Sequence, residues 1–171
     1  MGRVISCNYQ SDITYPGQKQ FDCGNPVIDK FVRASLKKSV RNSDCAAKAL
    51  IDRQSGELIG ICTFTAYSLE RQRVSGVLQG SQPSEIGVVR LVMLGVARKY
   101  QKRGFGQDLL CDFFEHVKII HQALPIKGVY LDADPAAINF YARLGFVQLS
   151  ATPNAFGAVP MFLAIQHILA A

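Results

Sequence analysis

The chain has 171 residues, of which 49% are hydrophobic and 19% are charged. This length and composition fit one folded globular domain, residues 1–171, and exclude a disordered chain. Lysine and arginine outnumber aspartate and glutamate by 19 to 13, and the resulting net charge of +6 favours anionic partners or simply keeps the chain in solution. Apolar runs are too short for a membrane span, and the first residues have no apolar signal core, so we expect a cytoplasmic protein with no membrane contact.

Five cysteines are scattered along the chain, with no C-x-x-C pair among them. An odd, unpaired set predicts reduced and mostly buried thiols. The three histidines do not lie at ligand spacing from these cysteines, so no metal site is expected.

The first half of the chain predicts strands, one helix and a long loop. The ranges are strands at 4–7, 46–52 and 58–66, a helix at 26–41 and a loop at 70–84. Asn25 followed by Pro26 is a good helix start, because Asn caps the first turn and Pro suits its first position. One face of this helix is apolar, and the other is basic, with Lys30, Arg33, Lys37, Lys38 and Arg41.

The second half alternates strands and helices. The ranges are strands from 88, at 128–132, 146–149 and 160–169, and helices at 104–122 and 135–144. Hairpin strands first and β-α-β-α-β later predict an α/β (α+β mixed) fold, with a mixed sheet covered by helices on both faces.

Residues 88–106, VVRLVMLGVARKYQKRGFG, combine an apolar strand, a basic turn and the start of a helix. Such a turn holds phosphate well, because glycine allows close approach and helix N–H groups point at the anion. The stretch lacks the Gly-Lys-Ser/Thr of a mononucleotide loop and the third glycine of a dinucleotide fingerprint.

Gln101-x-x-Gly104-x-Gly106 resembles the pyrophosphate motif of the GNAT acetyltransferases, and DPAAINFYARLGF at 134–146 resembles their C-terminal signature. The resemblance implies a single GNAT domain with a central mixed, mostly antiparallel sheet flanked by helices, and acetyl-CoA as cofactor. FDCG at 21–24 followed by a basic helix is similar to the GNAT toxins of toxin–antitoxin pairs, which acetylate the α-amine of aminoacyl-tRNA.

The resemblance also implies roles for particular residues. Tyr141 is the expected general acid, which protonates the leaving thiolate; the alternative is a core aromatic on an amphipathic helix. Backbone N–H groups on the central strand would hold the thioester carbonyl. Asn139 would bind the pantetheine arm or order a water; the alternative is a solvated helix residue. The expected cofactor-binding residues are Leu94, Gly95, Val96, Gln101, Lys102, Arg103, Gly104, Phe105, Gly106 and Asn139.

No carboxylate lies between Ile86 and Lys102, where many family members place a general base. A lysine amine, with a pKa of about 10.4, needs such help at neutral pH, whereas an α-amine, at about 7.7–8.0, needs little. The missing base therefore favours an α-amine substrate.

Basic side chains are expected to hold the tRNA backbone through its phosphates; a solvated helix face is the alternative for the helical ones. The set is Arg33, Lys37, Lys38, Arg41 and Arg90. Arg90 differs from the others because it interrupts an apolar strand, and such charges are usually paired or functional.

The toxin branch further implies a ribbon-helix-helix antitoxin, a homodimer, and contact with DNA only through the antitoxin complex. Two other functions stay open at this point. One is acetylation of a protein N-terminus or a small amine, and the other is a non-catalytic module that binds coenzyme A or nucleic acid.

Overall fold

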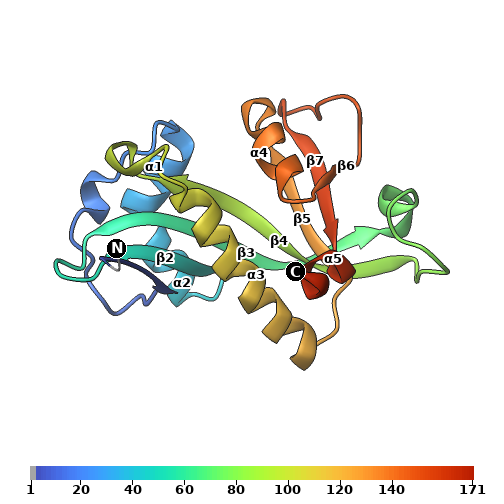
Figure 1. Ribbon diagram of the computed structural model, residues 1–171, viewed down its shortest axis with the longest axis horizontal. Helices are drawn as coiled ribbons and strands as arrows, with labels where there is room; N and C mark the ends of the chain where they lie inside the picture. The colour runs from blue at the N-terminus through green and yellow to red at the C-terminus, as the bar shows by residue number, and fades with distance from the viewer. Residues whose placement is uncertain (1–2) are drawn as a thin grey trace. The chain divides into compact units, whose positions relative to one another are not determined.

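The computed structural model describes residues 3–171, which form two compact units. The first unit contains the described residues up to Thr65 together with Val92–Glu115, and the second contains Ala66–Leu91 and His116–Ala171. Within the described residues the strands follow the order β1-β2-β3-β4-β5-β7-β6 in one seven-stranded sheet (Figure 1). This mixed, mostly antiparallel sheet with flanking helices confirms the predicted fold class. That residues 1–171 make a single domain stays a prediction.

Three antiparallel strands and a helical segment build the first unit. Strand β1 (Val4–Asn8) pairs with β2 (Ala46–Asp52), and β2 pairs with β3 (Leu58–Glu70). Helix α3 (Phe105–Ala123) begins in this unit. Its Asp112 forms an ion pair with Lys48 of β2, with Oδ2 and Nζ 3.0 Å apart. The core gathers buried side chains from the N-terminal segment, the first helices and the strands, among them Phe21, Val32, Leu36, Ala49 and Ile61.

The helix predicted for 26–41 is two helices, α1 (Pro26–Ala34) and α2 (Leu36–Arg41). Asn25 caps α1 as expected, because its side chain accepts from the N–H groups of Val27 and Ile28. The helix breaks at Ser35, whose φ of −122° leaves the helical range. Serine competes for backbone hydrogen bonds and so favours such a junction. Both Val32 before the break and Leu36 after it are buried in the core.

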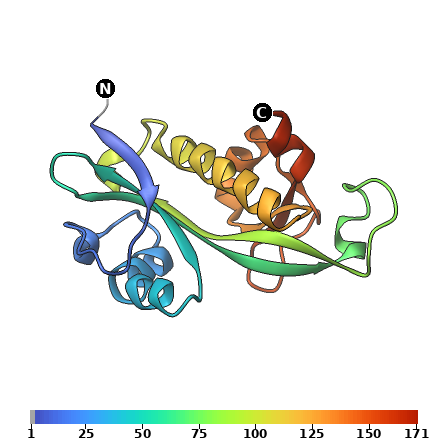
Figure 2. The ribbon, with the colours of Figure 1, turned by 90° about the horizontal axis from the view of Figure 1, so that it is seen from below.

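The second unit holds the C-terminal strands together with the parts of β3 and β4 that lie within residues 66–91. Strand β4 (Glu85–Val96) pairs in parallel with β5 (Gly128–Ala133) over Val89–Leu91. Strand β7 (Val159–Ala164) pairs antiparallel with both β5 and β6 (Val147–Gln148). The predicted loop at 70–84 contains the short 3-10 helix η2 (Arg71–Val74) and joins β3 to β4 (Figure 2). Its Val74 and Leu78 pack into the core cluster of this unit.

The end of the chain corrects one prediction. The strand expected at 160–169 stops at Ala164, and helix α5 (Ile165–Ala170) follows. Helical spacing puts Ile165 and Ile168 on one face, where both are buried. An unbroken apolar run cannot distinguish a buried strand from a buried helix, and this run contains both.

None of the helices in residues 3–171 is long and apolar enough to cross a membrane. The same residues contain no cluster of His, Cys, Asp or Glu suited to a metal ion.

Candidate functional site

The loop between β4 and α3 has the backbone shape of an anion-binding turn. After the 3-10 helix η3 (Arg98–Tyr100), Lys102 and Gly104 adopt left-handed φ angles of 62° and 83°. Glycine adopts this conformation without strain. At Lys102 the left-handed φ costs conformational free energy, which the contacts of the surrounding loop must offset. Helix α3 begins immediately afterwards at Phe105.

The start of α3 leaves donors for a ligand. The first intrahelical bond runs from the Asp108 N–H to the Gly104 carbonyl at 3.0 Å, so the N–H groups of Phe105, Gly106 and Gln107 lack intrahelical acceptors. Nothing lies within 4 Å of the position that a Gly104 side chain would fill, so a ligand has room at this point. The turn is also basic: Lys102 and Arg103 are exposed, and the Arg103 guanidinium lies 5.7 Å from the ring centre of Tyr100.

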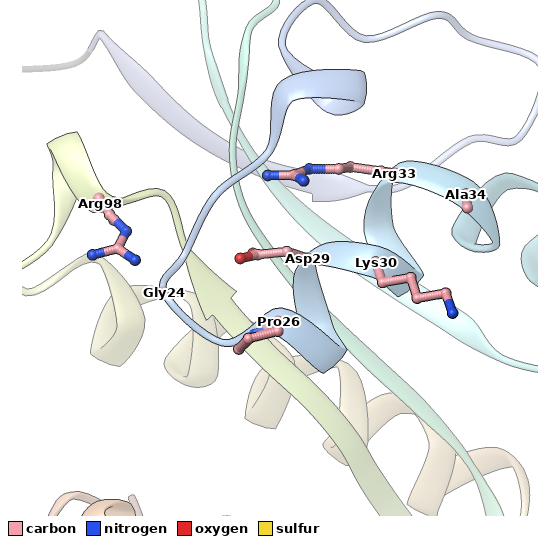
Figure 3. Close-up of a pocket in the computed structure, with 7 residues that line it drawn as sticks. All are labelled: Gly24, Pro26, Asp29, Lys30, Arg33, Ala34 and Arg98. Atoms are coloured by element: carbon pink, nitrogen blue, oxygen red, sulfur yellow. The ribbon is translucent and has the colours of Figure 1, made fainter.

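The FDCG segment, residues 21–24, is fastened beside this loop. Arg98 donates from its backbone N–H to the Asp22 carbonyl and from Nε to the Asp22 carboxylate, both at 2.9 Å. The guanidinium of Arg98 holds the pKa of Asp22 below its ordinary value, so the pair stays charged at neutral pH. On the α1 side, Asp29 accepts from the Cys23 N–H at 2.7 Å, and Arg33 Nε donates to the Phe21 carbonyl at 2.6 Å. Figure 3 shows Asp29 and Arg33 reaching toward the segment, while Lys30 points away.

Gln101 opens the glycine motif, but its side-chain amide is engaged within the protein. Nε2 donates to the Cys23 carbonyl at 2.7 Å and to the Val96 carbonyl at 2.8 Å. An amide nitrogen has two hydrogens, so these two bonds use both donors. The motif predicted the position of Gln101, whereas the link to Cys23 spans 78 residues and has no local signal.

The predicted carbonyl-binding residues Leu94, Gly95 and Val96 lie at the end of β4, beyond its register with β5. Leu94 and Val96 are half-buried, and Gly95 is buried. A side chain at Gly95 would lie 3.1 Å from Cys23 Sγ and from Ile28 Cγ2. The glycine therefore lets the FDCG segment and the start of α1 approach the strand.

Two neighbouring hollows of the first unit share Arg33. One has a volume of about 450 Å³ and is lined by Gly24, Pro26, Asp29, Lys30, Arg33, Ala34 and Arg98 (Figure 3). The other, of about 400 Å³, is lined by Arg33, Lys37 and the segment from Thr14 to Gln20. Lys38 and Arg41 lie on α2 and line neither hollow. Of the four basic residues on these helices that are predicted to hold tRNA, Arg33 and Lys37 therefore line a hollow, and Lys38 and Arg41 do not.

The predicted acid Tyr141 and Asn139 lie in the second unit on helix α4 (Ile138–Arg143). Tyr141 is 9% exposed and meets Phe140 and Phe146 edge-on, with ring centres 5.1 and 5.6 Å away. The ring is thus held by aromatic packing on two sides. Asn139 is exposed, so its amide is open to a ligand or to water.

Arg90 belongs to a cluster of two arginines, two tyrosines and one aspartate. Its Nη2 lies 3.1 Å from Asp132 Oδ2, and its guanidinium lies 5.1 Å from the ring centre of Tyr67. The Tyr67 and Tyr130 rings stack at 5.4 Å and 6°. The Tyr130 hydroxyl donates to Asp132 Oδ1 and accepts from Arg73 Nη2, both at 2.8 Å.

One donor in this cluster is not used. Among the described residues, Arg90 Nε is buried and has no hydrogen-bond partner. The pairing expected for a charge in an apolar strand is therefore confirmed, although it is incomplete. Sequence reasoning missed Tyr67, Tyr130 and Asp132, because the strand register that places Arg90 beside Tyr130 has no local signal in the sequence.

The predicted site residues thus gather in two groups. The cofactor loop, the end of β4, Arg33 and Lys37 lie in the first unit, and Asn139, Tyr141 and Arg90 lie in the second. Within the first unit the structure brings the glycine loop, β4 and the FDCG segment into direct contact.

Comparisons with known proteins agree with this architecture. The curated "tRNA-acetylating toxin" of Mycobacterium tuberculosis (strain ATCC 25618 / H37Rv) is 23% identical over 128 residues, covering 74% of this chain and 75% of the relative. A solved structure described as a bacterial toxin is 98% identical, with a TM-score of 0.96, and the match covers 98% of this chain and 93% of the other.

A more distant solved structure is AtaT complexed with acetyl-methionyl-tRNAfMet. It is 22% identical and has a TM-score of 0.83, with 98% of each chain covered. A mutant AtaT toxin, bound to the C-terminus of the antitoxin AtaR and to acetyl-CoA, is 21% identical with a TM-score of 0.79, covering 97% of this chain and 96% of the other. These two likenesses show a shared fold.

A sequence model of the acetyltransferase (GNAT) domain matches residues 47–148, more than half of the chain. The chain therefore belongs to the GNAT acetyltransferase family.

Proposed function

We propose that this protein transfers the acetyl group of acetyl-CoA to the α-amine of an aminoacyl-tRNA and thereby blocks translation. Membership of the GNAT family and the similarity to the tRNA-acetylating toxin support this function. The observation that carries the coenzyme assignment is the left-handed turn at Lys102 and Gly104, which leads directly into the unpaired N–H groups of α3.

Acetyl-CoA fits the residues of the first unit. The N–H groups of Phe105 and Gly106 and the side chains of Lys102 and Arg103 would hold its pyrophosphate. Leu94, Gly95 and Val96 would offer backbone N–H groups to the thioester carbonyl. Gln101 would support this loop through its bonds to two carbonyls, and Gly104 would supply the turn. Asn139 would contact the pantetheine arm.

The coenzyme supplies an activated acetyl group as a thioester. An α-amine bound here would take up that acetyl group through a new N–C bond in place of the C–S bond. Tyr141 would give its hydroxyl proton to the departing sulfur as general acid. The proton that the amine loses would go to solvent, from which Tyr141 would regain its own. Because an α-amine has a pKa of about 7.7–8.0, a useful fraction of it is neutral near pH 7, and the reaction needs no carboxylate on β4.

The RNA would be held by basic side chains from both units. Arg33 and Lys37 border the hollows of the first unit, and Lys38 and Arg41 extend the positive charge along α2. Arg90, whose side chain is 33% exposed, would offer its guanidinium to a phosphate oxygen. Such contacts bind RNA without reading its sequence and weaken as salt is added.

A toxin of this kind needs a partner that silences it. We expect an antitoxin with a ribbon-helix-helix DNA-binding fold, so that the toxin reaches DNA only within that complex. We also expect a homodimer that acts in the cytoplasm, where aminoacyl-tRNA is made.

Labelled acetyl-CoA tests the proposal against its alternatives. Purified protein is incubated separately with bulk aminoacyl-tRNA, uncharged tRNA, a polyamine and a peptide mixture. Label on aminoacyl-tRNA alone is the expected result. Label on peptide or polyamine instead would support acetyl transfer but reject the tRNA substrate. If coenzyme A binds and no acceptor is labelled, acetyl transfer itself is rejected.

A further inference from the structure

Three consecutive carbonyls of the FDCG segment accept hydrogen bonds from three different places. Arg33 Nε of α1 donates to Phe21 at 2.6 Å, and the Arg98 N–H donates to Asp22 at 2.9 Å. The third carbonyl, that of Cys23, receives Gln101 Nε2 at 2.7 Å. The segment therefore connects the basic helix α1 to the glycine loop through its own main chain.

Gln101 makes the connection at the loop end. The same nitrogen that binds the Cys23 carbonyl also binds the Val96 carbonyl at 2.8 Å. One amide group thus ties three pieces of backbone together: the end of β4, the glycine loop and the FDCG segment. Both of its hydrogens point at protein carbonyls, so it has no donor left for a phosphate.

The other end of the connection is Arg33. Its Nε is used by the Phe21 carbonyl, and the residue lines both hollows of the first unit. A guanidinium has five donors, so this single bond orients the group and leaves donors for an anion. Any shift of the FDCG segment would therefore move the donors of Arg33.

We propose that Gln101 is a positioning residue, which holds the FDCG segment against the coenzyme loop and so couples coenzyme binding to the orientation of Arg33 toward RNA. This inference rests on the proposed function for the identity of the two ligands. The amide of Gln101 thus binds two carbonyls of the protein and not the pyrophosphate of the coenzyme.

The chemistry of the position provides the test. Gln101→Glu has nearly the same shape but presents acceptors to two carbonyl oxygens, so both bonds are lost and replaced by repulsion. Gln101→Arg supplies several N–H donors and should restore them. Arg98 and Asp22 still join the segment to the loop in either variant, so the chain should fold. Gln54→Glu is the matched control, because Gln54 is exposed in a turn and the change of charge is the same.

The first measurement uses the protein without ligand. Hydrogen–deuterium exchange of the peptide spanning residues 21–31 should be faster in Gln101→Glu, while strands β1 and β2 exchange as in the wild type. Gln101→Arg and Gln54→Glu should match the wild type. Unchanged exchange in Gln101→Glu would overturn the proposal, whatever reaction the protein catalyses.

The second measurement uses calorimetry to compare the affinity for coenzyme A with and without uncharged tRNA, and the affinity for uncharged tRNA with and without coenzyme A. Gln101→Glu should weaken coenzyme A binding on the order of tenfold, because without these two bonds the loop spends only part of the time in its binding conformation. In the wild type each ligand should tighten the other by the same factor, and in Gln101→Glu that factor should approach one. Equal factors in both proteins, or equal losses in Gln101→Arg and Gln101→Glu, would contradict a positioning role.

The two proposals can fail separately. A protein that binds coenzyme A but no tRNA would reject the tRNA substrate, and exchange of residues 21–31 would still decide the role of Gln101.

Discussion

In the first unit the Gln101 side chain beside the glycine loop donates only to backbone carbonyls, whereas in the second unit the arginine–tyrosine cluster bonds side chain to side chain. Gln101 and Arg98 hold the main chain of the FDCG segment. Arg90 and Tyr130 instead meet the carboxylate of Asp132. The first arrangement fixes backbone positions, which a pyrophosphate and a thioester carbonyl need, while the second fixes side chains against one another.

This difference predicts opposite sensitivities. Changes of backbone space or conformation should harm the first unit most, and removal of single functional groups should harm the second unit most.

The largest expected effect is the loss of the Tyr141 hydroxyl. Tyr141→Phe should lower kcat by about a hundredfold or more, because a positioned general acid contributes about 10²–10⁴ in rate. The aromatic packing against Phe140 and Phe146 does not require the hydroxyl. Coenzyme A affinity should therefore stay close to the wild type, as calorimetry would check, and thermal unfolding would show that the variant is folded. Undiminished turnover in this variant would leave Tyr141 as a core aromatic only.

The next effect concerns space at the end of β4. Gly95→Ala places a methyl group 3.1 Å from Cys23 Sγ and Ile28 Cγ2, so the FDCG segment and α1 must move. Overpacking of this kind costs about 1–3 kcal/mol, which urea unfolding would measure. Coenzyme A affinity should fall with it, because the same strand end and loop shift.

Gly87→Ala is the matched control on the same strand. Gly87 is exposed and has no atom within 4 Å of an added Cβ, so stability should stay near the wild type. Equal losses in the two variants would mean that strand flexibility, and not the contact with the FDCG segment, requires glycine at position 95.

Local sequence patterns predicted much of this architecture. The Asn25-Pro26 start, the glycine loop and α3 follow from nearest-neighbour chemistry, which a single sequence displays. The Ser35 break and α5 were missed, because an apolar stripe or run reports burial and not where a helix stops or replaces a strand.

The contacts that position the candidate site were less accessible. Gln101 reaches Cys23 across 78 residues, and Arg90 reaches Asp132 across 42. Such contacts depend on strand register and on how loops return to the sheet. Sequence periodicity identified Arg90 as an unusual charge, but it could not name Tyr67, Tyr130 or Asp132 as its partners.

A smaller effect is expected from Arg90, whose partly exposed guanidinium lies in the arginine–tyrosine cluster. Arg90→Gln should weaken binding of aminoacyl-tRNA several-fold and lower the slope of log affinity against log salt by about one, as for one lost phosphate contact. Filter binding at several salt concentrations would show both changes. Lys127→Gln removes one exposed positive charge from the same unit and should change the slope less. If both variants behave alike, Arg90 acts through net charge and not through a direct contact.

The smallest effect is a pH dependence in the same cluster. Burial is the main cause that raises the pKa of Tyr130, and its bond to Asp132 adds to this, although Arg73 opposes it. Folded protein therefore keeps the Tyr130 proton at pH values where unfolded chain has begun to lose it. Stability from this group is fully present below the unfolded pKa of about 10 and declines as pH rises above it. Tyr130→Phe should flatten this decline in urea unfolding measured between pH 9 and about 11, while Tyr9 and Tyr15, whose pKa values are also raised, contribute equally to both proteins. An equally steep decline in the variant would show that the Tyr130 proton does not contribute to stability, and that the cluster is held by ring stacking and the Arg90–Asp132 pair.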